Sequence, residues 1–245
     1  MKILIIEPFF IGSHKTWAEG YANISSHEVE IISLPGRFWK WRMHGGAITL
    51  AKRFNKLNFE PDLILATDML NLPVFQALVK PNCPVAIYFH ENQFTYPWSP
   101  NDTDVELKRD KHYGFINYSS AFSADHVYFN SQFHLDSFFI GLENFLKQFP
   151  DYREIQNIES IRGKSSVLYL GLNLKILDNY KVDKQSDCTP LILWNHRWEH
   201  DKRPEEFFKI LELLSYKGVE FQLAVLGEEF KEELPCFSQA RKKLQ

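Results

Sequence analysis

The sequence has few cysteines and no long apolar run. Its three cysteines, Cys83, Cys188 and Cys236, are far apart and form no C-x-x-C pair, which argues against a disulfide framework and a zinc–thiolate cluster. Reduced thiols are typical of the cytosol, so we expect a cytoplasmic protein. No stretch approaches the roughly 18 apolar residues of a membrane-spanning helix. The N-terminus does not have the pattern of a signal peptide, so we expect no membrane partner.

Several functional motifs are also missing. The sequence contains no G-x-G-x-x-G, no G-x-x-x-x-G-K-[ST] and no G-x-S-x-G, so a dinucleotide cofactor, a phosphate-binding loop and a serine hydrolase are not supported. The formal net charge of −3 excludes a global basic field but allows a local basic patch. No obligate protein partner is evident. Aromatic residues, in contrast, make up 15% of the chain, and some of these rings could stack on sugars or bases.

Apolar strands alternate with amphipathic helices along the chain, as in an α/β protein with parallel sheets. Ser13 and Ser131 are placed to cap helices, and Pro73 lies near the start of another. Strands are expected at 2–6, 28–33, 62–66, 84–89, 126–129 and 166–170. Helices are expected at 14–24, 47–58, 72–79, 112–123 and 131–147.

The alternation restarts after a polar segment, which predicts two Rossmann-like domains. Residues 1–172 form the first domain, 173–189 a linker, and 190–245 part of a second domain. The second part contains expected strands at 191–195 and 220–226 and a helix at 204–217. Fewer than roughly 60 residues rarely close such a domain, so we expect a truncated or reduced second domain.

Unusual segments follow the predicted strands, and ligands bind open parallel sheets at the carboxyl ends of strands. The first is Gly12-Ser13-His14, where a helix N-terminus favours an anionic group. An ordinary strand-to-helix turn is the alternative. The second runs from His90 to Trp98 and mixes hydrogen-bonding with aromatic side chains, as sugar recognition requires. Its polar members include His90, Glu91, Asn92 and Gln93.

The third segment, residues 194–204, leads from a strand into a helix. Arg197 and Lys202 could both face a diphosphate and stabilise a departing nucleotide. His196 and His200 complete an H-x-x-E-H pattern, but a zinc peptidase needs both histidines on a helix, so we predict no metal site. The D-x-D of residues 102–104 has polar flanks and is interpreted as surface.

The fourth segment, residues 37–42, interleaves basic and aromatic side chains. This combination suits phosphate pairing and base stacking in single-stranded nucleic acid. A loop with its rings packed inward and its charges solvated is the alternative. The candidate contacts are Arg37, Trp39, Lys40, Trp41 and Arg42.

Four motifs, taken in order, resemble the tRNA-queuosine α-mannosyltransferase family, a branch of the retaining GT-B glycosyltransferases. They are Pro8-Phe9-Phe10-Ile11-Gly12-Ser13-His14, Phe89-His90-Glu91-Asn92-Gln93, Phe129-Asn130-Ser131 and the run from Trp194 to Lys202. The resemblance implies transfer of mannose from GDP-mannose to queuosine in the anticodon of an aspartate tRNA. It also implies a GT-B fold of two Rossmann-like domains.

The resemblance assigns roles to individual residues. His90 would contact the donor sugar, while Arg197 and Lys202 would hold the diphosphate. The leaving diphosphate would help to deprotonate the acceptor, without a metal or cofactor, although Glu91 or Glu7 could act as a base. The other donor-site candidates are Gly12, Ser13, His14, Asn195, Gly227 and Glu228; those for the acceptor are Asn92, Gln93 and the residues of 37–42.

Two other functions stay open at this point. One is a GT-B enzyme with another nucleotide-sugar donor and a glycan or lipid acceptor. The other is a truncated, non-catalytic module that binds nucleotides or RNA.

Overall fold

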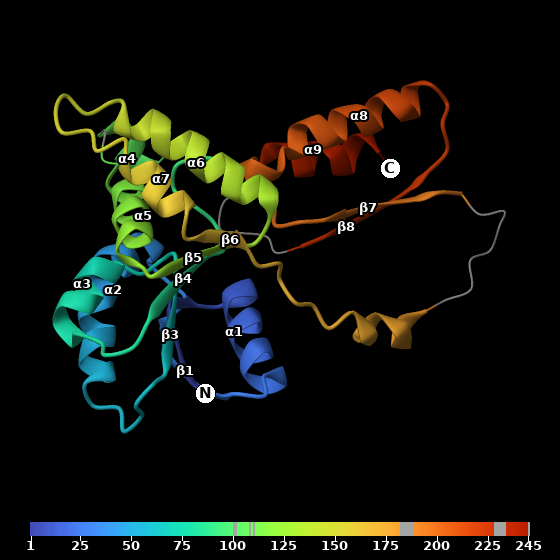
Figure 1. The fold of residues 1–245 in the computed structure, drawn as a ribbon. Helices are drawn as coiled ribbons and strands as arrows, with labels where there is room; N and C mark the ends of the chain where they lie inside the picture. The colour runs from blue at the N-terminus through green and yellow to red at the C-terminus, as the bar shows by residue number, and fades with distance from the viewer. Residues whose placement is uncertain (100–101, 108, 110, 182–188, 228–233, 245) are drawn as a thin grey trace. The chain divides into compact units, whose positions relative to one another are not determined.

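Figure 1 shows the fold of the chain in a computed structural model. The structure describes residues 1–99, 102–107, 109, 111–181, 189–227 and 234–244. Among these residues, no helix is both long enough and apolar enough to cross a bilayer. The chain divides into two compact units. The first comprises Met1–Tyr96 and Asp102–Asn173, and the second comprises Leu174–Gln245 with Pro97–Asn101.

The first unit is built on a six-stranded parallel sheet of order β2-β1-β3-β4-β5-β6. The strands are β1 (Lys2–Phe10), β2 (Glu28–Pro35), β3 (Leu63–Thr67), β4 (Val85–Phe89), β5 (His126–Phe129) and β6 (Ser165–Val167). The central strands are almost continuous runs of buried residues, as expected for a parallel sheet covered on both faces. The predicted α/β class with a parallel Rossmann-like sheet is confirmed.

Helices cover both faces of this sheet. They are α1 (Gly12–Ile24), α2 (Trp39–Phe54), α3 (Leu72–Val79), α4 (Thr103–Glu106), α5 (Lys111–Ser123), α6 (Gln132–Leu146) and α7 (Asn157–Arg162). The larger core joins side chains of α2, α3, α5, α6 and α7 to one face of the sheet. On the other face, Trp17 and Tyr21 of α1 pack against Tyr88 and its neighbours. Figure 1 shows α2 and α3 on one side of β1 and β3, and α1 on the other.

Two of the predicted helix starts are confirmed, and one is wrong. Ser131 caps α6 by accepting a hydrogen bond from the backbone N–H of His134 at 3.1 Å. Pro73 lies in the first turn of α3. In α1, however, the helix begins at Gly12 after an N-cap residue, Ile11, that has no side-chain cap, so Ser13 lies inside the first turn.

Helix α2 begins well before the predicted start at residue 47, at Trp39. The adjacent Gly45 and Gly46 lie inside the helix. A Cβ on Gly45 would lie 2.7 Å from the Trp41 ring, and one on Gly46 would lie 3.6 Å from the side chains of Leu34 and Pro8. Gly45 therefore lets the Trp41 ring pack closely against the helix, whereas the contacts at Gly46 are of ordinary van der Waals length.

The second unit contains a two-stranded parallel sheet of β7 (Leu191–Asn195) and β8 (Gln222–Leu226). Two helices pack on it, α8 (Pro204–Tyr216) and α9 (Pro235–Lys243), and the short 3-10 helices η1 (Leu174–Tyr180) and η2 (His200–Lys202) complete it. The Trp198 ring stacks on Phe237 of α9 with centroids 4.3 Å apart. The sequence analysis did not anticipate α9. Part of the predicted linker, residues 182–188, lies outside the described residues.

Candidate functional site

A buried ion pair lies at the carboxyl end of β1. The Glu7 carboxylate is fully buried, and its Oε1 accepts a hydrogen bond from the backbone N–H of Phe9 at 2.8 Å. Its Oε2 lies 3.1 Å from Nδ1 of His14, in the first turn of α1. The register of β1 against β2 shifts between Glu7 and Phe10, so the strand is irregular where the carboxylate turns back toward the helix.

His90 directly follows β4, and its backbone is held from two sides. Its N–H donates to Oδ1 of Asp68, the residue after β3, at 2.8 Å. Its carbonyl accepts a hydrogen bond of 2.8 Å from Nδ2 of Asn130, the residue after β5. Three neighbouring strand ends therefore fix the position of this histidine.

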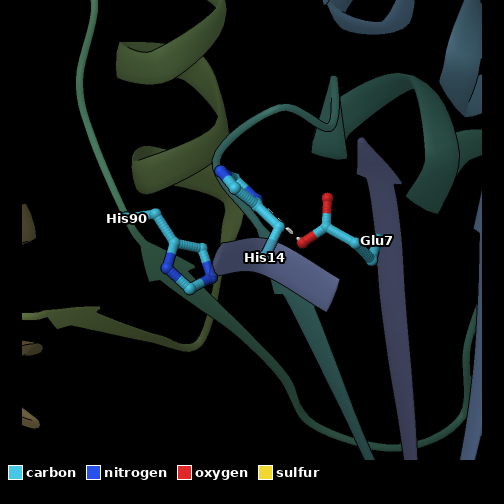
Figure 2. Close-up of side chains that lie close together, drawn as sticks. All are labelled: Glu7, His14 and His90. Atoms are coloured by element: carbon cyan, nitrogen blue, oxygen red, sulfur yellow. Dashed lines mark hydrogen bonds and ion pairs between the residues drawn. The ribbon is translucent and has the colours of Figure 1, made fainter. Parts of the chain in front are cut away.

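The His90 imidazole packs beside the His14 imidazole, with ring centroids 4.3 Å apart. Trp17 and Tyr88 complete its surroundings at 4.8 and 4.9 Å. Figure 2 shows His14 between the His90 ring and the Glu7 carboxylate. Among the described residues, the buried Nε2 of His90 has no hydrogen-bond partner, which leaves it to a ligand.

The two imidazoles differ in charge. Burial opposes protonation of His14, but the hydrogen bond and charge of Glu7, together with Asp68 and Glu91, raise the pKa of His14 to about 9. Burial, together with the charges of His14 and His134, lowers the pKa of His90 to about 2. At neutral pH a buried imidazolium therefore lies beside a neutral imidazole.

Burial raises the pKa of the Asp68 carboxyl well above its ordinary value of 3.8, and the carboxylates of Glu91 and Glu7 act in the same direction. The charge of His14 and the N–H of His90 oppose this shift. Asp68 therefore takes up a proton more readily than an exposed aspartate does. The same carboxyl group accepts the hydrogen bond from the backbone N–H of His90.

Glu7, His14 and His90 could together hold a metal ion. One ligand atom from each lies within 4.8 Å of the others. Two imidazole nitrogens and a carboxylate oxygen are donors that zinc and other transition metals accept. A metal ion would have to displace the proton that His14 shares with Glu7, since a ligating imidazole nitrogen must be deprotonated.

The loop after His90 is held by its own polar side chains. Oδ1 of Asn92 accepts hydrogen bonds from the backbone N–H groups of Phe94 and Thr95 at 3.0 and 3.1 Å. The N–H of Gln93 donates to Oδ1 of Asn117 at 2.8 Å, and Nδ2 of Asn117 donates to the carbonyl of Asp68 at 3.0 Å. Asn92 and Gln93, predicted as acceptor contacts, are thus buried and shape the loop.

Three other candidates lie in the first unit: Glu91 in this loop, and Gly12 and Ser13 in the turn before the buried His14. Glu91 accepts a hydrogen bond from Nε2 of Gln93 at 3.2 Å, and its charge acts on His14 and Asp68. Gly12 and Ser13 are exposed. Gly12 has a φ of 52° and open space around its missing Cβ, so the turn before His14 leaves room for a ligand.

The aromatic–basic segment 37–42 forms the start of α2. Arg37 and Trp41 are exposed, whereas Trp39 packs on Tyr113 with ring centroids 5.0 Å apart. Nζ of Lys40 lies 2.6 Å from both Oδ1 of Asp102 and Oδ2 of Asp104. Nε of Arg42 donates to a carbonyl of β2. The segment therefore divides into exposed residues and residues that fix the helix start.

The D-x-D at residues 102–104 is part of this attachment, and its interpretation as free surface is wrong. Asp104 is 8% exposed, and its carboxylate also accepts a hydrogen bond of 3.0 Å from the Tyr113 hydroxyl. Lys40 and Tyr113 lower the pKa of Asp104, which keeps this carboxylate charged.

In the second unit, the predicted diphosphate residues lie on the connection from β7 to α8. The Arg197 guanidinium pairs with Oε2 of Glu199 at 3.1 Å, and Nζ of Lys202 pairs with Oδ2 of Asp201 at 2.8 Å. Asn195 ends β7 and is exposed. This connection contains a turn and a short 3-10 helix, so its two histidines do not share a helical face.

Gly227 directly follows β8 and has a conformation that needs a glycine. Its φ is 122°, and a Cβ would lie 2.0 Å from the carbonyl oxygen of His196. The end of β8 thus lies directly against the connection that carries Arg197. Glu228, also predicted for the donor site, lies outside the described residues.

A family model described as "tRNA-queuosine alpha-mannosyltransferase N-terminal" matches residues 2–172. The chain belongs to the tRNA-queuosine alpha-mannosyltransferase family. This confirms the resemblance found in the motifs. A curated relative from Drosophila melanogaster, named tRNA-queuosine alpha-mannosyltransferase, is 34% identical over 255 residues. The alignment covers 99% of this chain but 65% of the relative, so the chain spans a little under two thirds of the relative's length.

Glu7, His14, Asp68, His90 and Asn130 form a cluster at the carboxyl ends of the strands, called the strand-end cluster below. The family match includes this cluster, whereas Arg197 and Lys202 lie beyond the match. Within the matched region, sequence reasoning missed three supporting residues of this cluster: Asp68, Asn117 and Asn130. Asn130 directly follows a predicted strand, as His90 does, whereas Asp68 lies two residues past the predicted strand end at residue 66. Neither residue is connected to His90 until the strand order is known. The partner of Gln93, Asn117, lies within α5 rather than after a strand.

Proposed function

We propose that this chain transfers mannose from GDP-mannose to queuosine in the anticodon of tRNA-Asp, with retention of configuration at the sugar. Its membership of the tRNA-queuosine alpha-mannosyltransferase family carries this proposal. The relative's name specifies a queuosine-bearing tRNA and an α-mannosyl product. The chain spans 65% of that relative's length, so the relative's activity is proposed, rather than shown, for this chain.

The strand-end cluster of the first unit is proposed to hold the donor sugar. The neutral His90 offers a buried Nε2 without a partner among the described residues, and a sugar hydroxyl is a suitable partner for it. The imidazolium of His14 and the open turn at Gly12 and Ser13 provide positive charge and space beside it. Glu91 is the alternative base beside this cluster, should a protein side chain rather than the leaving diphosphate take the acceptor proton.

The second unit is proposed to hold the nucleotide diphosphate. Arg197 pairs with Glu199 and Lys202 pairs with Asp201, and a diphosphate would offer these cations more negative charge than the two carboxylates do. Asn195 and Gly227 border the same connection. The two cations would stabilise the departing diphosphate in place of a metal ion, and the diphosphate would take the proton of the acceptor hydroxyl on the same face of the sugar.

Calorimetry with GDP, UDP and ADP tests the donor half of the proposal. We expect the chain to prefer GDP and Arg197→Ala to weaken GDP binding by at least about tenfold, because a hydrogen bond to a charged group contributes about 1.5–3 kcal/mol. Arg203→Ala is the matched control, since Arg203 is exposed nearby and pairs with Glu206. Equal binding of the three nucleotides, or unchanged GDP binding in Arg197→Ala, would contradict the assignment.

A further inference from the structure

A long stretch around α2 contains no acidic residue. Between Glu30 and Glu60 there is neither Asp nor Glu, although the whole chain has a net charge of −3. The basic residues of this stretch are Arg37, Lys40, Arg42, Lys52, Arg53 and Lys56. The stretch is therefore a local basic region within an acidic protein, as a polyanionic partner requires.

The structure places part of this charge on one exposed face of α2. Trp41, Ile48 and Lys52 are all exposed, and their spacing of seven and four residues puts them on one side of α2. Lys56, also exposed, lies in the turn that directly follows the helix. The opposite side of the helix, including Leu50, is buried in the core. At 1.5 Å per residue, α2 has a length of about 24 Å, which spans several nucleotides.

The aromatic end of this face lies at the carboxyl end of β2. Phe38 is 73% exposed and Trp41 is 64% exposed. Phe38 has a φ of 56°, a left-handed conformation that is strained for a residue with a side chain, and the Arg37 guanidinium lies 6.0 Å from its ring. Strain that keeps an aromatic ring in solvent indicates a contact surface rather than a core position.

The aromatic end adjoins the strand-end cluster. Gly36 lies directly against Ile11, because a Cβ on Gly36 would be 2.1 Å from the Ile11 side chain. Ile11 precedes the Gly12 turn and His14. The Lys40 ammonium holds the start of α2 through Asp102 and Asp104. The exposed rings are therefore presented from a fixed backbone beside the proposed sugar site.

The basic end of the face lies at the far end of α2. In the part of the chain that the structure describes, no carboxylate pairs with Lys52 or Lys56. Arg53 and Arg42 donate instead to carbonyls of β2, at Ser33 and Pro35, and fasten the helix to the edge strand. Two lysines thus remain for an external anion.

We propose that this face of α2 docks a hairpin RNA. Phe38 and Trp41 stack on unpaired bases of the loop, while Lys52 and Lys56 contact phosphates of the stem that leads away from it. The proposal rests on the proposed function, which supplies a hairpin RNA as acceptor. A lipid surface suits the face less well, because the apolar side of α2 is buried and its exposed lysine end is polar.

The test compares RNA binding by the unmodified 245-residue chain and five variants, measured by fluorescence anisotropy with a labelled hairpin RNA at several salt concentrations. The variants are Lys52→Gln/Lys56→Gln, Phe38→Ala and the control Lys147→Gln/Lys209→Gln, which removes one exposed lysine at the C-cap of α6 and one from α8. Phe38→Tyr and Phe38→Trp serve as conservative replacements. Thermal melting checks that each variant is folded.

We expect the Lys52→Gln/Lys56→Gln variant to weaken binding about five- to tenfold and to lower the slope of log K against log salt by about one per lysine. Phe38→Ala should weaken binding about tenfold with an unchanged salt slope, because it removes stacking and no charge. Phe38→Tyr and Phe38→Trp should restore binding.

Three outcomes would overturn the docking surface. If the chain binds hairpin RNA and the α2 variants bind as tightly as the control, RNA docks elsewhere and the proposed function is unaffected. If no version binds RNA although GDP still binds, the RNA acceptor itself is wrong. If anionic phospholipid vesicles bind α2 more tightly than RNA does, the partner of this face is a membrane surface.

Discussion

The residue that organises the candidate site is Glu7. Its buried carboxylate keeps His14 protonated, and the charge of His14 in turn helps to keep the neighbouring His90 neutral. A cation and a neutral hydrogen-bonding group are thereby placed side by side in a region shielded from water, where their interactions with a ligand are strong. None of these charge states is evident from the sequence, since Glu7 lies in β1 and His90 follows β4, more than 80 residues later.

This arrangement predicts a pH dependence of stability. The pKa of His14 is about 9 in the folded chain and 6.5 by default, so its stabilising contribution is complete below pH 6.5 and is lost as the pH rises through 9. The loss is at most roughly 3 kcal/mol. Because the pKa of Asp68 is also raised, its contribution to stability is likewise lost as the pH rises. The contribution of His14 is therefore measured as the difference in free energy of unfolding between the unmodified chain and His14→Gln.

Urea unfolding between about pH 6 and pH 10 measures this difference. We expect the free-energy difference between the unmodified chain and His14→Gln to shrink across that range, and Glu7→Gln to abolish most of its pH dependence. His27→Gln should have no such effect, because His27 forms no comparable pair with a buried carboxylate among the described residues. A pH-independent difference would show that the imidazolium is not held by Glu7.

At the scale of elements, α6 connects stability to the site. Its N-cap Ser131 follows Asn130, whose amide holds the carbonyl of His90. Ser131→Ala removes the acceptor of the His134 N–H, so we expect the free energy of unfolding to fall by about 1 kcal/mol. Ser215→Ala, at an exposed position within α8, should change it by less than about 0.5 kcal/mol. Equal effects of the two substitutions would contradict the capping role.

Element boundaries that depend on local chemistry could be predicted from the sequence. The bounds of α3, β5 and β7 are those expected, because apolar runs and local turn or helix-start signals define them. The start of α2 could not be predicted, since Gly45 and Gly46 have low helix propensity and yet lie inside the helix. His90 was found because it directly follows a strand. Its supports, Asp68 and Asn130, become apparent only when the order β3-β4-β5 is known.

At the scale of the whole molecule, the two units carry different halves of the proposed reaction. The first unit contains the strand-end cluster and the α2 face, and it matches the family over residues 2–172. The second contains the proposed diphosphate contacts on a two-stranded sheet. The chain spans 65% of its relative's length, so the central claim to test is that this chain itself transfers mannose.

The most direct test is transfer of radiolabelled mannose from GDP-mannose to tRNA-Asp that carries queuosine, with tRNA-Asp that lacks queuosine as the control. We predict label only in the queuosine-containing tRNA, equal transfer with and without a metal chelator, and a loss of about 100-fold in His90→Ala, as expected when a positioned catalytic group is removed. Label in both tRNAs, or in neither, would contradict the proposed acceptor; undiminished transfer by His90→Ala would contradict the proposed site.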